Sequence, residues 1–233
     1  MVEGRDRREI LARAGVYFIC DLERVREPAQ TCARVAEAGV RLVQLRLKGL
    51  GDRDAYTIAA QVALELRRRG ALLILNDRVD LALAVDADGV HLGPEDLPVS
   101  VARRLLGPDR LVGASAHSAA KASSLVQAGA DHLGCGSVFP TDTKADATVR
   151  GLDIVREVRA ATVVPVFGVG GIDVSNAGRV IQAGADGVAV VRAIGSASDP
   201  AAAAKQLLDA VRRMRDLRER AHSGSHSPSR DTR

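Results

Sequence analysis

Basic and amide side chains alternate with leucines in one short stretch of the chain. In the run Gln44-Leu45-Arg46-Leu47-Lys48, the two-residue period of a strand would place Gln44, Arg46 and Lys48 on one face. Two buried cations are unfavourable unless an anion meets them. Two interpretations are open: Arg46 pairs with a core acid while Lys48 is solvated, or the three side chains bind a phosphorylated ligand.

Two carboxylates follow the next two apolar segments. The pair Asn76-Asp77 follows four apolar residues, and Asp96 lies just past the segment Gly89–Leu92. Asp77 is also a typical N-cap residue for a helix over 79–85. The alternative is that Asp77 and Asp96 converge on one hard cation, and Mg²⁺ suits such a pair because substrate phosphates and waters complete its shell.

A serine and two histidines lie near the fifth and sixth apolar segments. Ser115 offers a hydroxyl at the end of Leu111–Ala114, and His117 opens the next helical pattern. A hydrolase is disfavoured, because residues two apart point the same way in a strand and no Gly-x-Ser-x-Gly turn is present. We interpret His132 as a structural residue and Cys135 as a small packing residue.

The segment 137–150 carries side chains suited to phosphate oxygens and has no regular pattern of its own. Its hydroxyls and ammonium come from Thr141, Thr143 and Lys144. A loop of this length in a compact domain is typical of a functional lid or of disorder. We favour the lid over a solvated loop.

Glycines and a short polar pair follow the last two apolar segments. Gly170-Gly171 follows the seventh segment, and Val191-Arg192 follows the eighth. Backbone N–H groups in such loops often hold a phosphate, and glycine permits the close approach. Two anion sites are therefore predicted, one metal-assisted and one glycine-rich.

Short apolar segments that alternate with amphipathic ones must position these residues. The segments with strand character are Val16–Cys20, Val40–Leu45, Ala71–Leu75, Gly89–Leu92, Leu111–Ala114, His132–Cys135, Val163–Phe167 and Gly187–Val190. Helical patterns between them include Pro28–Ala38, Arg53–Arg69, Ser118–Ala128, Asp153–Ala160 and Val174–Ala183. Eight such units predict an α/β protein with a single (β/α)8 TIM barrel. Chemistry then belongs at the carboxyl ends of the strands.

The net charge of +4 is concentrated at one end of the chain. Residues 212–233 contain seven arginines and three acids, so residues 1–211 are neutral. A nucleic-acid partner is not expected, because binding needs a basic face on the folded body. We expect an N-terminal extension over 1–13, the catalytic barrel over 14–221 and a disordered basic Ser/Arg-rich tail over 222–233.

Neither a membrane span nor a secreted protein is expected from the sequence. The longest uncharged stretch has 13 residues, Ala160–Ile172, against about 18 for a spanning helix. The N-terminus has no apolar signal region. Three cysteines without a Cys-x-x-Cys pattern indicate neither a disulfide framework nor a zinc site, so we expect a cytoplasmic protein.

Taken in order, these motifs resemble thiamine-phosphate synthase (thiamine-phosphate pyrophosphorylase). The resemblance covers about residues 14–213, and each motif is weak alone while the ordered set is specific. The matching motifs are Gln44-Leu45-Arg46-x-Lys48, Asn76-Asp77, Gly89-Val90-His91-Leu92-Gly93-x-x-Asp96, Ser115-Ala116-His117, Phe139-Pro140-Thr141-x-Thr143-Lys144-x-Asp146 and Gly170-Gly171-Ile172.

The resemblance implies a transferase with two small-molecule substrates. The family joins 4-amino-2-methyl-5-hydroxymethylpyrimidine diphosphate to a phosphorylated thiazole and releases pyrophosphate, through a pyrimidine methylene cation. It implies binding of the pyrimidine diphosphate by Gln44, Arg46, Lys48 and Asn76, Mg²⁺ on Asp77 and Asp96, Lys144 on the leaving diphosphate, Ser115 beside the reacting centre, and the thiazole phosphate on Thr141, Thr143, Gly171, Val191 and Arg192. It is also compatible with a homo-oligomer.

Two positions depart from the family pattern, and two other functions remain alternatives. Many members have Gly-Pro where this chain reads Cys135-Gly136-Ser137, and Arg192 stands where Ser is frequent. These differences concern the thiazole-phosphate contacts. The alternatives are a thiazole tautomerase-like enzyme, which would not need the full set of cations and carboxylates, and a catalytically inactive ligand-binding barrel.

Overall fold

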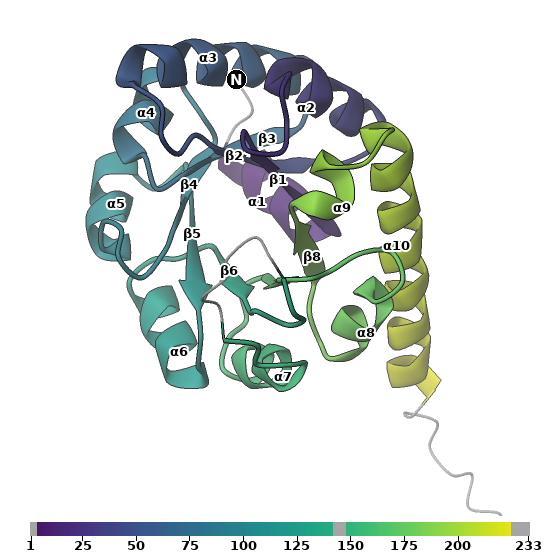
Figure 1. The fold of residues 1–233 in the computed structure, drawn as a ribbon. Helices are drawn as coiled ribbons and strands as arrows, with labels where there is room; N and C mark the ends of the chain where they lie inside the picture. The colour runs from purple at the N-terminus through teal and green to yellow at the C-terminus, as the bar shows by residue number, and fades with distance from the viewer. Residues whose placement is uncertain (1–3, 142–147, 225–233) are drawn as a thin grey trace, which may run out of the picture.

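Eight parallel strands close into a barrel in the order of the chain, with β8 paired to β1 (Figure 1). This computed structural model describes residues 4–141 and 148–224. Within those ranges the strands are β1 (Val16–Asp21), β2 (Leu42–Arg46), β3 (Leu72–Asn76), β4 (Gly89–Leu92), β5 (Leu111–Ala116), β6 (His132–Cys135), β7 (Val166–Val169) and β8 (Gly187–Val190). The predicted single (β/α)8 barrel is confirmed.

Helices surround the barrel, as Figure 1 shows. In the described residues they are α1 (Gly4–Arg13), α2 (Pro28–Glu37), α3 (Asp52–Arg68), α4 (Val79–Ala84), α5 (Val99–Leu106), α6 (Ala119–Gln127), α7 (Asp153–Ala160), α8 (Ala177–Gln182), α9 (Arg192–Gly195) and α10 (Pro200–Gly224). The short α9 follows β8 directly, so Arg192 stands at the first position of a helix at the carboxyl end of the barrel.

Two predicted boundaries differ from the structure by three residues each. Strand β7 begins at Val166 rather than Val163, whose side chain is 91% exposed. Helix α8 begins at Ala177 rather than Val174, because the preceding residues form a hydrogen-bonded turn. In that turn Asp173 Oδ1 accepts from Ser175 N at 2.8 Å, and Asn176 Oδ1 accepts from Asp173 N at 2.9 Å. Polar side chains of this kind compete with the helix for backbone groups.

Strand β2 shows how the two-residue period separates the inner and outer layers. Leu42 belongs to the cluster inside the barrel, while Val43 and Leu45 pack in the larger cluster with the surrounding helices. Gln44 follows the inward direction of Leu42 and is buried. The expected face assignment of Gln44 and Leu45 therefore holds, and it sends polar side chains of β2 toward the barrel axis.

Helix α1 packs against the barrel interior, and Figure 1 shows it across the middle of the barrel view. Its Leu11 is 2% exposed and joins the inner cluster with residues such as Leu72 and Phe167. Arg7 Nε donates to Asp88 Oδ1 at 2.7 Å, which ties the helix to the segment before β4. Burial of this helix face leaves the opposite, carboxyl end of the barrel as the open one.

Helix α10 continues to Gly224, beyond the predicted start of the tail at residue 222. It contacts α8 and α2 on the outside of the barrel. The predicted tail from residue 225 onward lies outside the described residues. Among the helices of the described ranges, none has the length and apolar character needed to cross a membrane.

Candidate active site

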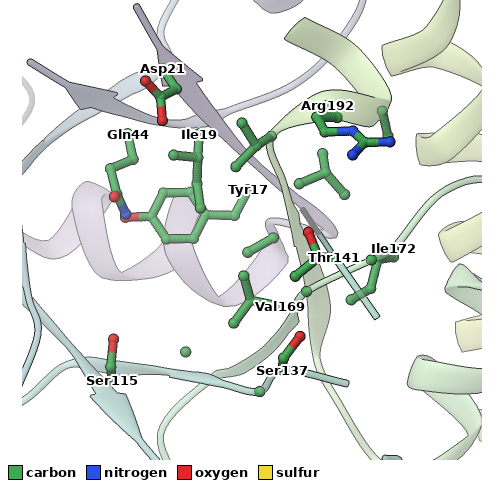
Figure 2. A pocket seen from close by; sticks show the side chains of 18 of the residues that line it. Tyr17, Ile19, Asp21, Gln44, Ser115, Ser137, Thr141, Val169, Ile172 and Arg192 are labelled. Atoms are coloured by element: carbon green, nitrogen blue, oxygen red, sulfur yellow. The ribbon is translucent and has the colours of Figure 1, made fainter. Parts of the chain in front are cut away.

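A cavity of about 1030 Å³ lies at the carboxyl ends of the strands. Figure 2 shows four of the residues predicted from the sequence on the wall of this cavity, Gln44, Ser115, Thr141 and Arg192. With these, eight predicted residues line the cavity: Gln44, Arg46, Asn76, Ser115, Thr141, Gly171, Val191 and Arg192. Parallel strands end at one edge, so residues far apart in the chain meet there. Residues from both predicted anion sites thus line a single cavity.

The other five predicted site residues are not found among the described residues that line the cavity. Lys48, Asp77 and Asp96 are not among the residues that line the cavity. Thr143 and Lys144 lie outside the described residues. The loop from Ser137 is described only to Thr141 and again from Thr148 onward, and Thr141, Thr148 and Arg150 all line the cavity.

Arg46 both pairs with a core acid and lines the cavity. Its Nη1 donates to Asp21 Oδ2 at 2.8 Å, and the Asp21 side chain is only 5% exposed. The two interpretations of Arg46 are therefore compatible. Asp21 was missed in the sequence, although it follows the rule applied elsewhere, since it is the last residue of β1.

Lys48 and Asp77 form an ion pair at the ends of β2 and β3. The Lys48 side chain remains half-exposed, so its expected solvation is accompanied by a carboxylate partner. Asn76 Nδ2 donates to the same Asp77 oxygen at 3.0 Å. The capping interpretation of Asp77 is wrong: Arg78 precedes α4 as its N-cap, and no side chain caps that helix.

Asp77 and Asp96 are held at the adjoining ends of β3 and β4. Asp77 N donates to His91 O at 2.9 Å, and Asp96 Oδ2 accepts from Gly93 N at 2.7 Å. Asp77 has a φ of 57°, a left-handed conformation that Asp and Asn adopt more readily than other side chains. Two oxygen-donor carboxylates here fit the hard ligand set of Mg²⁺, which keeps other positions for water and phosphate.

A hydrogen-bonded group of polar side chains forms part of the cavity wall. Gln44 Nε2 donates to Tyr17 Oη at 2.8 Å, and burial raises the pKa of Tyr17, so its hydroxyl stays protonated. His91 Nε2 lies 3.1 Å from Ser115 Oγ. Figure 2 shows Tyr17, Gln44 and Ser115 around the same space. Tyr17 was also missed in the sequence, because its aromatic ring reads as a core residue.

Gly170 and Gly171 allow the loop after β6 to lie directly on the end of β7. Their φ angles are 101° and 62°, and a Cβ at Gly170 would overlap the Ser137 side chain. A Cβ at Gly171 would overlap Pro140 O and lie 2.8 Å from Phe139 Cβ. Phe139 N donates to Gly170 O at 3.0 Å. Glycine is therefore required here for backbone packing as well as for the predicted approach of an anion.

His132 lies in the barrel interior, as the structural interpretation predicted. It is fully buried, and burial lowers the pKa of its imidazole to about 3. Its ring packs edge-on against Tyr17 and Phe167, with centroids 5.6 and 5.9 Å away. Cys135 is buried as expected for a packing residue, and burial raises the pKa of its thiol to about 12. A protonated thiol of this kind is a poor nucleophile.

Comparison of the sequence with known proteins shows to which family the chain belongs. The family model for thiamine monophosphate synthase matches residues 16–194. The chain belongs to this family. It is 45% identical over 202 residues to a thiamine-phosphate synthase of Natronomonas pharaonis, covering 84% of this chain and 94% of that protein.

A further sequence relative and a solved structure are also similar to this chain. A bifunctional thiamine biosynthesis protein of Symbiobacterium thermophilum is 51% identical over 187 residues. The match covers 80% of this chain but only 39% of that longer protein. Among solved structures, the thiamine phosphate pyrophosphorylase of Pyrococcus furiosus superposes with a TM-score of 0.81 at 38% identity, covering 89% of this chain and 98% of that one.

Proposed function

We propose that the chain is a thiamine-phosphate synthase. It transfers the pyrimidine methylene group of 4-amino-2-methyl-5-hydroxymethylpyrimidine diphosphate to the ring nitrogen of 4-methyl-5-(2-phosphoethyl)thiazole. The products are thiamine phosphate and pyrophosphate. The observation that carries the proposal is the single cavity that joins cationic and amide side chains on β2 and β3 to the glycine loop and Arg192 after β7 and β8.

The pyrimidine diphosphate is assigned to the side of the cavity formed by β2 and β3. Gln44 and Asn76 supply amide groups, and Arg46 supplies a guanidinium that forks onto phosphate oxygens. Asp21 accepts a hydrogen bond from one edge of that guanidinium, so Arg46 is oriented before the ligand arrives. Lys48 stands beside Asp77 as a further positive charge for the diphosphate.

Asp77 and Asp96 are the residues that would hold Mg²⁺. When bound, this ion would neutralise charge on the departing diphosphate. Lys48 and Asn76 both direct positive or N–H groups at Asp77, so the carboxylate is held in one orientation before a cation arrives. Lys144, assigned from its motif, would meet the same leaving group.

Bond breaking comes first in the proposed reaction. The C–O bond to the diphosphate breaks with its electron pair on oxygen, which leaves a pyrimidine methylene cation that the thiazole nitrogen then attacks. No side chain needs to act as a nucleophile. Arg46, Lys48 and Lys144 stabilise the developing negative charge, and Ser115 lies beside the reacting centre. A closed loop over 137–150 would keep water from trapping the cation.

The thiazole phosphate is assigned to the opposite side of the cavity. Thr141, Thr143, Gly171, Val191 and Arg192 are its ligands by motif. Arg192 adds a positive charge at a position where the family often has Ser. Its place at the start of α9, among the residues that line the cavity, favours direct contact with the phosphate.

Pyrophosphate release tests the proposal. Purified protein is given the pyrimidine diphosphate with and without the thiazole phosphate, in Mg²⁺ and in EDTA. Release that needs both substrates and the metal, with thiamine phosphate formed, supports the synthase. Thiazole isomerisation without pyrophosphate release would instead indicate a tautomerase, and tight ligand binding without turnover would indicate an inactive binding barrel.

A further inference from the structure

Two buried histidines connect Ser115 to the interior of the barrel. His91 Nε2 lies 3.1 Å from Ser115 Oγ, and His91 Nδ1 lies 3.5 Å from His132 Nε2. The three residues come from β4, β5 and β6, which are adjacent in the barrel. Gly113 makes room for them, because a Cβ there would overlap His132 Nε2 and lie 2.6 Å from His91 Nδ1.

In each of the two histidine rings, the position of the proton decides which nitrogen donates a hydrogen bond and which accepts one. A neutral imidazole has one N–H donor and one acceptor nitrogen. His132 is neutral at physiological pH, since full burial lowers its pKa to about 3. Its Nδ1 has no hydrogen-bond partner within the described part of the chain. His132 Nδ1 is therefore unsatisfied, either as an N–H donor or as a lone-pair acceptor.

Two arrangements of His132 differ in the group left without a partner. With the proton on Nδ1, a buried N–H donor is orphaned, and Nε2 accepts from His91. With the proton on Nε2, only a lone pair is orphaned, and Nε2–H donates to His91 Nδ1. Orphaned buried N–H groups are rarer in proteins than under-used acceptors. The second arrangement is therefore favoured.

We propose that His132 and His91 are positioning residues that make Ser115 a hydrogen-bond donor to the substrate. His132 Nε2–H donates to His91 Nδ1, and the remaining proton of His91 sits on Nε2 and donates to Ser115 Oγ. The serine hydroxyl hydrogen is then directed away from His91. In the reverse arrangement Ser115 would donate to His91 and offer the cavity only lone pairs.

This inference rests on the proposed function for the identity of the acceptor. Ser115 lines the cavity, as Figure 2 shows, and its hydroxyl would donate to an acceptor atom of the pyrimidine diphosphate. Gln44 supplies an acceptor to complement this donor, because its Nε2 donates to Tyr17 Oη and its Oε1 can accept from the ligand. The cavity wall therefore offers both a donor and an acceptor, as an aminopyrimidine requires, since it carries both a ring nitrogen and an amino group.

Nitrogen NMR of the unmodified full chain tests the proton positions without any turnover. Protein labelled with ¹⁵N-histidine is examined by long-range ¹H–¹⁵N correlation at pH 7.5, with His91→Gln and His132→Gln for assignment. His117 is an internal reference, because its Nδ1 lies 3.0 Å from Gly136 O and must be protonated to donate. We expect His132 to carry its proton on Nε2 and His91 Nε2 to be protonated. A proton on His132 Nδ1 would overturn the proposal.

A double-mutant comparison tests the route through Ser115. His132→Leu removes the donor, and we expect kcat/KM to fall about 5-fold to 10-fold, the value of one hydrogen bond. His132→Gln keeps an N–H near the Nε2 position and should stay within about 3-fold of the parent. In a Ser115→Ala background, His132→Leu should cause no further loss. Equal losses in both backgrounds would reveal a merely structural role and contradict the proposal.

Discussion

Asp21 and Arg46 are direct partners in the register between β1 and β2, and their side chains form an ion pair at the mouth of the barrel. Asp21 Oδ2 lies 2.8 Å from Arg46 Nη1, and the Asp21 carboxylate is almost fully buried. Its other oxygen accepts from Glu23 N at 3.1 Å. The carboxylate is thereby fixed, and it fixes the guanidinium in turn.

We predict that Asp21→Asn weakens binding of the pyrimidine diphosphate. The amide keeps the shape of the carboxylate but loses the charge-assisted hydrogen bond, so Arg46 samples more orientations. The loss of about 1–2 kcal/mol corresponds to a rise in KM of about 5-fold to 30-fold. Steady-state kinetics with the pyrimidine diphosphate varied measures the effect. Glu23→Gln, an exposed neighbour, is the matched control, and an equal rise there would contradict the positioning role.

The carboxylates Asp77 and Asp96 lead to a prediction about metal dependence. Asp77→Asn and Asp96→Asn should each raise the Mg²⁺ concentration needed for half-maximal activity by at least about 10-fold. Asn is the suitable replacement at position 77, because it tolerates the φ of 57°. Titration of activity against Mg²⁺ gives the shift. Asp109→Asn, on an exposed turn, should leave the titration unchanged, and an unshifted titration in both test variants would exclude this site.

The rule that barrel chemistry lies at strand ends was sufficient to locate the cavity and eight of the residues that line it. It needs only the order of apolar segments, because parallel strands bring their carboxyl ends together whatever their exact register. Arg46, Asn76 and Ser115 were found in this way. Thr143 and Lys144, which the same reasoning selected, fall outside the described residues and stay predictions.

Contacts that depend on pairing between strands could not be read from the sequence. Asp21 is one residue among several acids until the β1–β2 register places it opposite Arg46. The His91–His132 contact likewise needs two strands on either side of β5 and a glycine between them. The Asp173 turn shifts the start of a helix through side-chain hydrogen bonds, which a hydrophobic period does not report.

The glycine at the end of β7 gives a third prediction. Gly171→Ala should lower the free energy of unfolding by about 1–3 kcal/mol, because the new Cβ overlaps backbone at Pro140 and the φ is left-handed. For a chain of this size, the melting temperature should fall by about 2–12 °C. The KM for the thiazole phosphate should rise as well, since the loop must move.

Gly51→Ala is the control for Gly171→Ala. A Cβ at Gly51 meets nothing within 4 Å, and its φ of −68° is ordinary for any residue. Calorimetry and kinetics on both variants separate a local overlap from a general effect of removing glycine. A Gly171→Ala protein with an unchanged melting temperature would show that the loop does not rest on β7 as described.

Burial of His132 predicts a pH dependence of stability. The folded pKa of about 3 lies below the usual 6.5, so the unfolded chain takes up a proton on this ring while the folded chain does not. Stability is therefore unaffected by His132 above pH 6.5 and falls as the pH drops below it, by about 1 kcal/mol per pH unit. Urea unfolding at pH 7.5, 6 and 5 measures the slope. His132→Gln should have a shallower slope, and parallel slopes in the two proteins would contradict this account.

Arg215 joins the last helix to the start of the barrel, and we predict that it stabilises the fold without serving the site. Its Nη1 and Nη2 donate to Arg13 O at 3.0 Å and Ala14 O at 2.9 Å, and burial lowers the pKa of its guanidinium. Arg215→Ala leaves two carbonyls with fewer partners and should lower the free energy of unfolding by about 1–3 kcal/mol.

Kinetic constants distinguish this structural role from a catalytic one. The link lies between α10 and the connection from α1 to β1, at the end of the barrel opposite the cavity, so KM for both substrates should stay within about 2-fold of the parent. Arg213→Ala, an exposed arginine on the same helix, should change the melting temperature by less than about 1–2 °C. Equal destabilisation by the two substitutions would mean that helix charge, rather than the contacts with Arg13 and Ala14, holds α10 in place.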